Sequence, residues 1–272
     1  MRIDVRPPAV AGHFYPADPD RLRALIDELL AGVPRERRRC RAVVVPHAGL
    51  VYSGACAAAV FGRLAPVSTV VILAPNHSGC CESPGASLWD RGAFATPLGT
   101  VPIDASFAAA LMQRSHLACH DPVAHRVEHA IEVELPFLQV VMPSASIVPI
   151  VVAWDDWPRT RDFAESLAAC VAARTDVLVV ASSDMTHYEP AAAAARKDRA
   201  ALEVMARLDG AGLLDVCRRG HITMCGRVPA AVAIEAARRL GAAEADVVDY
   251  RHSGMVSGEE ERVVGYAGVM FS

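Results

Sequence analysis

The stretch CRAVVVPHAGLVYSG, residues 40–54, contains a short run of β-branched residues that ends at a histidine. The valines at 43–45 predict a buried strand, because a strand covered on both faces reads as a continuous apolar run. His47 follows directly after Pro46, and Gly49 lets the turn that follows pass close to another group, since glycine has no side chain. Imidazole is a common metal ligand and a proton-transfer group near neutral pH, so its place at the end of a buried strand needs an explanation.

The rest of the chain repeats this strand-then-helix order. Further β-branched runs predict strands at residues 69–73, 147–152, 177–181 and 263–270. Apolar residues at helical spacing predict helices at residues 20–30, 55–64, 106–114, 129–141, 161–173, 191–208 and 228–240. Residues 92–103 read as a hairpin around Pro97-Leu98-Gly99. We therefore predict one layered α/β domain over residues 1–272, with a central mixed or mostly parallel sheet flanked by helices.

Composition excludes several classes of function. With 27 basic and 31 acidic residues the formal charge is −4, which gives no reason to expect a nucleic acid or an anionic membrane as partner. The start of the chain does not resemble a secretory signal, and no apolar stretch is long enough for a membrane helix, so we expect a cytoplasmic protein. The eight cysteines form no C-x-x-C pair, which makes a disulfide framework or a zinc knuckle improbable.

Three of the predicted strands are each followed by a histidine. His47, His77 and His187 come after the strands at 43–45, 69–73 and 177–181. Ligands of α/β sheets bind beyond the carboxyl ends of parallel strands, where these side chains would meet. A single histidine at a strand end is most often structural, but three together predict a metal site or a proton-transfer site.

Two other residues extend this predicted site. Cys225 lies just before Gly226 and the helix that Pro229 starts, so helix-terminal amides would favour its thiolate; the alternative is a buried, inert cysteine. Asp184 precedes His187 by three residues, which in a helical turn places both on one face. It could orient that histidine or a metal-bound water, or it could simply cap a helix.

A second polar cluster surrounds residues 125–132. It contains His125, Glu128, His129 and Glu132, and positions 128 and 132 would share a face of a helix. Acidic residues favour helix starts, so a solvated first turn explains them without a function. We keep the cluster as a candidate wall of the pocket, with the roles of these residues open.

Seven motifs, in order along the chain, give this sequence a family resemblance. They are RPPAVAGHFYP (6–16), PHAGLVYSG (46–54), APNHSG (74–79), TPLG (96–99), EHAIEVELPFL (128–138), SSDMTHY (182–188) and CGRVP (225–229). Together they resemble the Memo family, whose bacterial members are called AmmeMemoRadiSam system protein B. The resemblance implies a fold like that of the class III extradiol dioxygenases, which are non-haem iron enzymes.

The resemblance also implies roles for individual residues. His47, His77 and Cys225 correspond to metal ligands, while Asp184 and His187 correspond to a nearby catalytic pair. The dioxygenases use two histidines and a carboxylate, so the thiolate of Cys225 is a departure that changes the charge and the redox potential of the site. Cleavage of a catechol ring therefore does not follow from the fold.

Three functions are compatible with these residues. The first is an oxidoreductase that uses Fe(II), or copper, with His187 as general acid/base and Asp184 orienting it. The second is a zinc hydrolase, since two histidines and a cysteine with an open position also form a catalytic zinc pattern. The third is a non-catalytic adaptor that uses the same pocket for binding. The resemblance further implies association with a radical-SAM protein and an AMMECR-domain protein.

Overall fold

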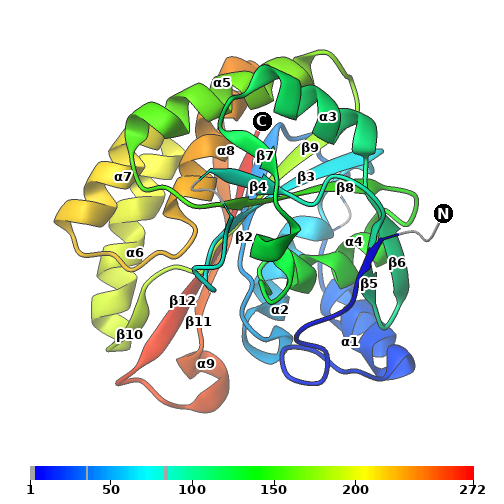
Figure 1. Cartoon of the computed structure of the whole chain (residues 1–272). Coiled ribbons are helices and arrows are strands. Elements are labelled where there is room, and N and C mark those ends of the chain that lie inside the picture. The colour runs from blue at the N-terminus through cyan, green and yellow to red at the C-terminus, as the bar shows by residue number, and fades with distance from the viewer. Residues whose placement is uncertain (1–3, 35, 83–84) are drawn as a thin grey trace.

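The centre of the fold is a parallel sheet of four strands. The computed structural model describes residues 4–34, 36–82 and 85–272. Within them the strands β2 (Ala42–Val45), β9 (Val177–Ser182), β3 (Thr69–Pro75) and β8 (Ser146–Val152) lie side by side in that order, all parallel. Because β9 lies between β2 and β3, the carboxyl ends of these three strands meet at one edge (Figure 1).

Antiparallel strands extend the sheet on both sides. On one side β12 (Val263–Phe271) pairs with β2 and also with β10 (His187–Glu189) and β11 (Ala245–His252). On the other side β4 (Ala86–Leu88) is antiparallel to β8 and parallel to β7 (Ala118–His120). The sheet is therefore mixed, as predicted. The predicted hairpin is formed by β5 (Ala93–Thr96) and β6 (Gly99–Pro102), and β1 (Val5–Arg6) joins it in a small second sheet.

Helices cover both faces of the main sheet, which confirms the layered α/β prediction (Figure 1). In β3, Val70 and Ile72 pack into the core on one face, whereas Val71 and Leu73 pack into the core on the other. The first face is covered by α1 (Pro19–Ala31), α2 (Leu50–Phe61) and α4 (Leu135–Val141). The second is covered by α3 (Ala105–Arg114), α5 (Trp157–Ala172), α6 (Ala191–Ala206), α7 (Gly210–Arg219) and α8 (Arg227–Arg239).

Several predicted boundaries were wrong. The helix predicted at 129–141 is α4 alone, preceded by the 3-10 turn η2 (Glu132–Glu134). Pro136 suits a first helical turn, and hydrogen bonds from Arg6 and Tyr15 hold Glu132 before it. The helix predicted from residue 55 begins at Leu50 instead. Neither α7 nor β11 was predicted; β11 carries charged residues because it pairs with β12 alone among the described strands.

Two remaining predictions concern the chain as a whole. The predicted single domain of residues 1–272 includes residues 1–3, 35 and 83–84, which lie outside the described residues. None of the helices in the described ranges is both long enough and apolar enough to cross a membrane. The described residues also form the short elements η1 (Pro122–His125) and α9 (Gly254–Ser257).

Candidate metal centre

The central strands bring the predicted site residues to one edge of the sheet. His47, His77 and Asp184 each lie two residues beyond the end of β2, β3 and β9 respectively. Because β9 pairs with both of its neighbours, Asp184 lies between the two histidines. The prediction that the strand-end histidines meet is correct for His47 and His77, whereas His187 is not part of the histidine group that they form.

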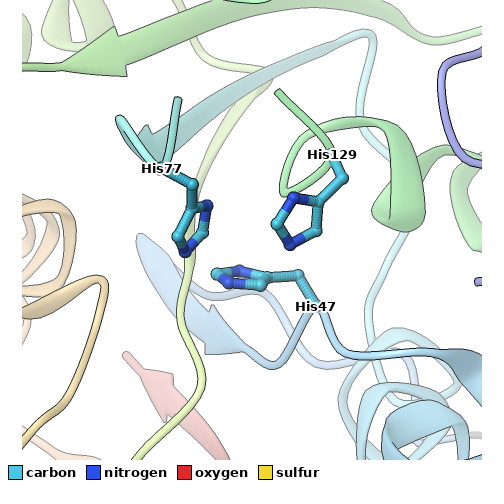
Figure 2. A group of neighbouring side chains, drawn as sticks. All are labelled: His47, His77 and His129. Atoms are coloured by element: carbon cyan, nitrogen blue, oxygen red, sulfur yellow. The ribbon is translucent and has the colours of Figure 1, made fainter. Parts of the chain in front are cut away.

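Three imidazoles form the centre of the site. One ligand atom from each of His47, His77 and His129 lies within 4.8 Å of the others, and Figure 2 shows the three rings turned toward a common point. The ring centroids are 5.1 Å apart for His47 and His77 and 4.6 Å apart for His77 and His129. The sequence predicts His129 only as part of a candidate pocket wall. The acidic residue Glu128 directly before it is the feature of the sequence that drew attention to this segment.

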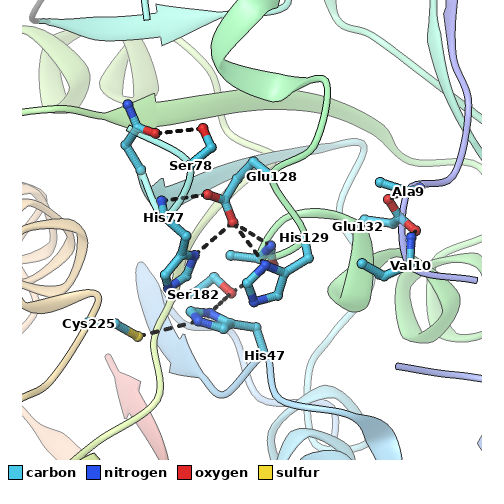
Figure 3. A network of polar contacts seen from close by, with 12 residues as sticks. Ala9, Val10, His47, His77, Ser78, Glu128, His129, Glu132, Ser182 and Cys225 are labelled. Carbon is cyan, nitrogen blue, oxygen red and sulfur yellow. Dashed lines mark hydrogen bonds and ion pairs between the residues drawn. The ribbon is translucent and has the colours of Figure 1, made fainter. Parts of the chain in front are cut away.

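Glu128 holds two of these histidines in place. Its Oε1 lies 2.9 Å from His77 Nδ1 and 3.5 Å from His129 Nδ1, and its Oε2 accepts a hydrogen bond from the backbone N–H of His77 (Figure 3). Burial raises the pKa of Glu128, but the hydrogen bond and charge of His77 outweigh burial and hold it below the usual range. The anionic carboxylate thus leaves the Nε2 atoms of both rings for another partner.

His47 is the most buried of the three histidines, at 1% exposed. Its Nδ1 lies 2.8 Å from Ser182 Oγ, and its backbone N–H donates to Asp184 Oδ1 at 2.9 Å. Burial, followed by repulsion from the neighbouring histidines, lowers the pKa of His47 well below its usual value. The ring is therefore neutral at pH 7, which is the form that binds metal.

Cys225 lies at the side of the three-histidine group. Its Sγ is 3.3 Å from His47 Nε2 and accepts a hydrogen bond from the backbone N–H of Asp184 at 3.2 Å (Figure 3). Burial raises the pKa of Cys225, and the charge of Asp184 adds to this effect, so they outweigh the backbone amide of Gly226, which lowers the pKa as expected. The thiol is therefore protonated in the metal-free protein, and a cation is what would favour its ionisation.

Asp184 and His187 do not share a helical face, contrary to the prediction. The chain from Ser182 to His187 is not helical, and His187 begins β10. Asp184 does not cap a helix either, since its Oδ1 accepts hydrogen bonds from the backbone N–H groups of His47 and Ala48, in the loop before α2. Burial raises the pKa of Asp184 to about 7, so this carboxyl titrates near neutral pH.

His187 is oriented by Thr223 rather than by Asp184. Its backbone N–H donates to Thr223 Oγ1 at 2.7 Å, and its Nδ1 lies 2.9 Å from the carbonyl oxygen of Thr223. A carbonyl can only accept, so Nδ1 carries the hydrogen and Nε2 is free to accept a proton. Burial lowers the pKa of His187, which keeps the ring neutral and suited to act as a base.

The N-terminal segment fixes the loop that carries Glu128 and His129. Arg6 forms an ion pair of 2.6 Å with Glu132, and both side chains are almost fully buried. Glu132 also accepts hydrogen bonds from Tyr15 Oη and from the backbone of residues 9 and 10. Positions 128 and 132 therefore do not lie in a solvated helical turn. The ring of Phe14 packs 4.7 Å from that of His129 and forms a wall of the site.

His125 has a structural role beside this ion pair. It is 1% exposed and lies outside the three-histidine group. Its Nε2 donates to the carbonyl oxygen of Ser87 at 2.9 Å, and its own carbonyl accepts a hydrogen bond from Arg6 Nε. Burial lowers the pKa of His125 to about 4, so it stays neutral.

A cleft of about 340 Å³ opens beside Cys225. It lies over the ends of β3 and β8 and the start of α8, and its polar lining includes Asn76, Asp155 and Arg227. Arg227 forms two hydrogen bonds with Asp155, of 2.6 and 3.0 Å. A small polar molecule in this cleft would lie beside Cys225.

The donor set fits a transition-metal ion. Neutral imidazoles and a cysteine sulfur are ligands that iron, copper and zinc accept, whereas Mg²⁺ and Ca²⁺ prefer oxygen. The Nδ1 atoms of His47 and His77 are engaged with Ser182 and Glu128, as is typical of ligating histidines. The site could therefore hold a metal ion, and its geometry does not identify which one.

Comparison with known proteins gives a consistent result. Residues 6–270 match a family model described as Memo-like protein. A MEMO1 family protein from Aquifex aeolicus is 41% identical over 98% of this chain and 99% of its own length. Another from Methanopyrus kandleri is 43% identical over 98% of both chains, and one from Methanothermobacter thermautotrophicus is 39% identical over 97% and 99%.

Proposed function

The chain belongs to the Memo family, and from this premise we propose that it is a metal-dependent oxidoreductase with a dioxygenase-like fold that acts on a small substrate. The observation that carries the proposal is the group of three imidazoles beside a cysteine, at the edge of the sheet where three strands end. We propose His47, His77 and Cys225 as the metal ligands, with His129 as a further donor to the same ion.

Fe(II) is the metal we favour, with copper second. A redox-active ion with open coordination positions would supply binding and activation of dioxygen or of a substrate oxygen. The thiolate distinguishes this donor set from the two histidines and carboxylate of the extradiol enzymes, so we do not propose cleavage of a catechol ring. The neighbouring cleft offers polar groups that could hold the substrate.

His187 is proposed as the general base of the reaction. Thr223 leaves its Nε2 unprotonated, and a group in that state can take a proton from a substrate hydroxyl. Asp184 is proposed to act on the site through the backbone of the His47 loop, because its carboxyl is bound there. The His187→Asn variant is expected to retain its full metal content, which separates a base from a ligand.

The test is metal analysis of anaerobically purified protein, combined with electron paramagnetic resonance. We expect about one iron, or copper, per chain, and loss of most of this metal in Cys225→Ser. The matched control is Cys119→Ser, because Cys119 is a partly buried cysteine on β7 at the edge of the sheet. Protein without stoichiometric iron or copper, or Cys225→Ser with unchanged metal content, would contradict the proposal.

A zinc hydrolase is the second candidate function. Three histidines also form a catalytic zinc site when a water completes the coordination, and Asp184, whose pKa is about 7, lies beside His47. This candidate predicts stoichiometric zinc, no paramagnetic signal and activity on an ester or amide that is insensitive to air. The metal analysis above separates the two functions.

A non-catalytic adaptor is supported by an exposed aromatic side chain next to the proposed base. Tyr188 is 65% exposed, and its ring centroid lies 5.8 Å from that of His187. If the pocket only binds, His187→Asn will change the affinity for a ligand and no turnover will be measurable. Association with a radical-SAM protein and an AMMECR-domain protein in the cytoplasm stays a proposal based on the family, and co-purification from cell extract tests it.

A further inference from the structure

Glu134 is a buried acid with an incomplete set of partners. It ends η2 and is 0% exposed. Its Oε1 lies 2.7 Å from Ser182 Oγ, while its Oε2 has no hydrogen-bond partner among the residues that the structure describes. An ionised carboxylate in such a place would carry a large desolvation cost. A buried acid of this kind needs an explanation beyond packing.

Ser182 connects Glu134 to the metal centre. Its hydroxyl has three neighbours at hydrogen-bond distance: Glu134 Oε1 at 2.7 Å, His47 Nδ1 at 2.8 Å and the carbonyl oxygen of Ala130 at 2.8 Å. Figure 3 shows Ser182 and Cys225 both next to the ring of His47, with Ser182 at Nδ1 and Cys225 at Nε2. Among the described residues Glu134 forms no hydrogen bond with a proposed ligand, so its hydrogen-bonded connection to the metal centre runs through this hydroxyl.

The hydrogen atoms can be placed by counting donors. A serine hydroxyl has one hydrogen to donate and two lone pairs to accept. The carbonyl of Ala130 can only accept, so satisfying it uses the single hydrogen of Ser182. Both remaining neighbours must then donate to Ser182 Oγ: Glu134 as a neutral carboxylic acid, and His47 through Nδ1–H. Every other assignment leaves two acceptors facing each other at 2.8 Å or less.

The placement of these hydrogen atoms decides which ring nitrogen of His47 is available to bind a metal. With the hydrogen on Nδ1, the Nε2 atom has its lone pair free, and Nε2 is the atom 3.3 Å from Cys225 Sγ. The thiol can donate its hydrogen to that lone pair in the metal-free protein. The Nε2 lone pair and the sulfur are thus turned toward the same point, where a metal ion would replace the thiol hydrogen.

We propose that Glu134 is a positioning residue of the metal centre, which donates a hydrogen bond to Ser182 and through Ser182 holds His47 with its Nε2 lone pair toward the metal. The burial of Glu134 supports this, because burial raises the pKa of its carboxyl well above the usual value. The role of His47 as a ligand rests on the proposed function. The orientation and protonation of the ring can be measured without any metal.

The first experiment is a double-mutant cycle on metal affinity, measured by titrating the metal-free protein with Co²⁺. Loss of a hydrogen bond behind a ligand weakens metal binding by about 10- to 100-fold, which is the loss we expect for Ser182→Ala. Glu134→Leu is expected to cost about 3- to 10-fold, and Glu134→Gln, whose amide can still donate, less than about 3-fold. Glu235→Gln, a buried acid on α8, is the control.

The double-mutant cycle also tests whether Glu134 acts on metal affinity through Ser182. If Glu134 acts only through Ser182, Glu134→Leu will have no further effect in the Ser182→Ala background, whereas independent effects would multiply. Multiplying effects would overturn the proposal. So would equal losses in Glu134→Gln and Glu134→Leu, because a donated hydrogen bond would then not be what matters, and so would wild-type affinity in Glu134→Leu.

The second experiment reads the tautomer of His47 in metal-free protein by nitrogen-15 nuclear magnetic resonance of the histidine rings. We expect the Nδ1–H form in the wild type and in Glu134→Gln, and a mixture of both tautomers in Ser182→Ala. A wild-type ring with its hydrogen on Nε2 would overturn the inference whatever the metal data show. If no metal binds but the Nδ1–H form is found, the proposed function fails and the positioning of His47 by Ser182 and Glu134 stands.

Discussion

Glu128 and Glu134 lie six positions apart, at opposite ends of one segment, and each lies behind a different histidine of the metal centre. Glu128 contacts His77 directly and its pKa is below the usual range, so it is an anion. Glu134 reaches His47 only through Ser182, and burial raises its pKa well above the usual range, so it is neutral. Both side chains are nearly inaccessible to solvent, which shows that burial alone does not decide their charge.

The difference comes from the partners that each carboxyl meets. Glu128 accepts from an imidazole and from two backbone N–H groups, which together stabilise the anion. Among the described residues, Glu134 forms a hydrogen bond only with a hydroxyl, and the single hydrogen of that hydroxyl is used by Ala130. Two glutamates in one segment thus give His77 an anionic partner and His47, through Ser182, a neutral one. Four measurements test this difference in charge.

The largest effect is expected from Arg6→Met, because Arg6 neutralises the third acid of the segment. Glu132 forms an ion pair with Arg6 in which neither side chain is more than 1% exposed. Removing one partner of a buried ion pair leaves an uncompensated charge and costs about 3 to 5 kcal/mol of unfolding free energy. Urea denaturation at pH 7 measures it. An exposed charge such as Arg23, replaced by Met, is the control, and an equal loss there would contradict the argument.

Glu128→Gln is expected to have the next largest effect. The variant loses a charge-assisted hydrogen bond to His77, so we expect a loss of about 2 to 3 kcal/mol in the free energy of unfolding. Because the same contact orients a ligand, Co²⁺ affinity should fall by about 10- to 100-fold. Parallel denaturation and metal titration check both. Unchanged affinity would show that Glu128 supports the fold only.

The contribution of His125 to the free energy of unfolding should depend on pH, with an effect smaller than that of Glu128→Gln. Burial lowers its pKa to about 4, below the ordinary value of 6.5, so only the unfolded chain binds a proton between these values. Stability from this residue is therefore lost as pH falls below 6.5, by 1.36 kcal/mol per unit, or about 2 kcal/mol at pH 5. His125→Gln should remove that part of the loss. If the unfolding free energies of wild type and variant have the same slope against pH between pH 6.5 and 5, the pKa of His125 is not lowered by folding.

The positions of the four central strands β2, β3, β8 and β9 and the meeting of His47 with His77 could be predicted from the sequence. Continuous β-branched runs identify covered strands, and parallel strands have their carboxyl ends at one edge. The orientation of His187 could not be predicted, because its partner Thr223 is 36 positions away and depends on the path of a loop. Sequence spacing suggested a helical turn with Asp184, but β-pairing with β12 places His187 in a strand.

The ionisation of buried groups was the least predictable feature. The helix start after Cys225 suggested a thiolate, but burial at the site outweighs the helix-terminal amides and keeps the thiol protonated. His129 joins the histidine group because Arg6 and Glu132 fix a non-helical segment, and a helical reading of residues 129–141 hides this. Such outcomes depend on contacts between residues more than a hundred positions apart, which local patterns do not report.

The smallest expected effect has the opposite sign and tests the contrast most directly. A carboxyl whose pKa is raised on folding must keep its proton while the unfolded chain ionises above about pH 4.5. Stability is therefore present below that pH and is lost as pH rises toward the folded pKa. Glu134→Gln cannot ionise in either state, so at pH 8 the variant should be more stable than wild type, by about 1 kcal/mol after imperfect replacement of its hydrogen bond.

The two glutamine variants should therefore respond to pH in opposite ways. Between pH 6 and pH 8 the stability of Glu134→Gln relative to wild type should rise, because the wild type increasingly carries the cost of its neutral carboxyl. Glu128→Gln should remain less stable than wild type at both pH values, because it has lost an anion that the fold stabilises. Urea denaturation of the three proteins at both pH values gives the comparison. A destabilised Glu134→Gln at pH 8 would mean that both acids are anions, and the neutral donor behind His47 would have to be abandoned.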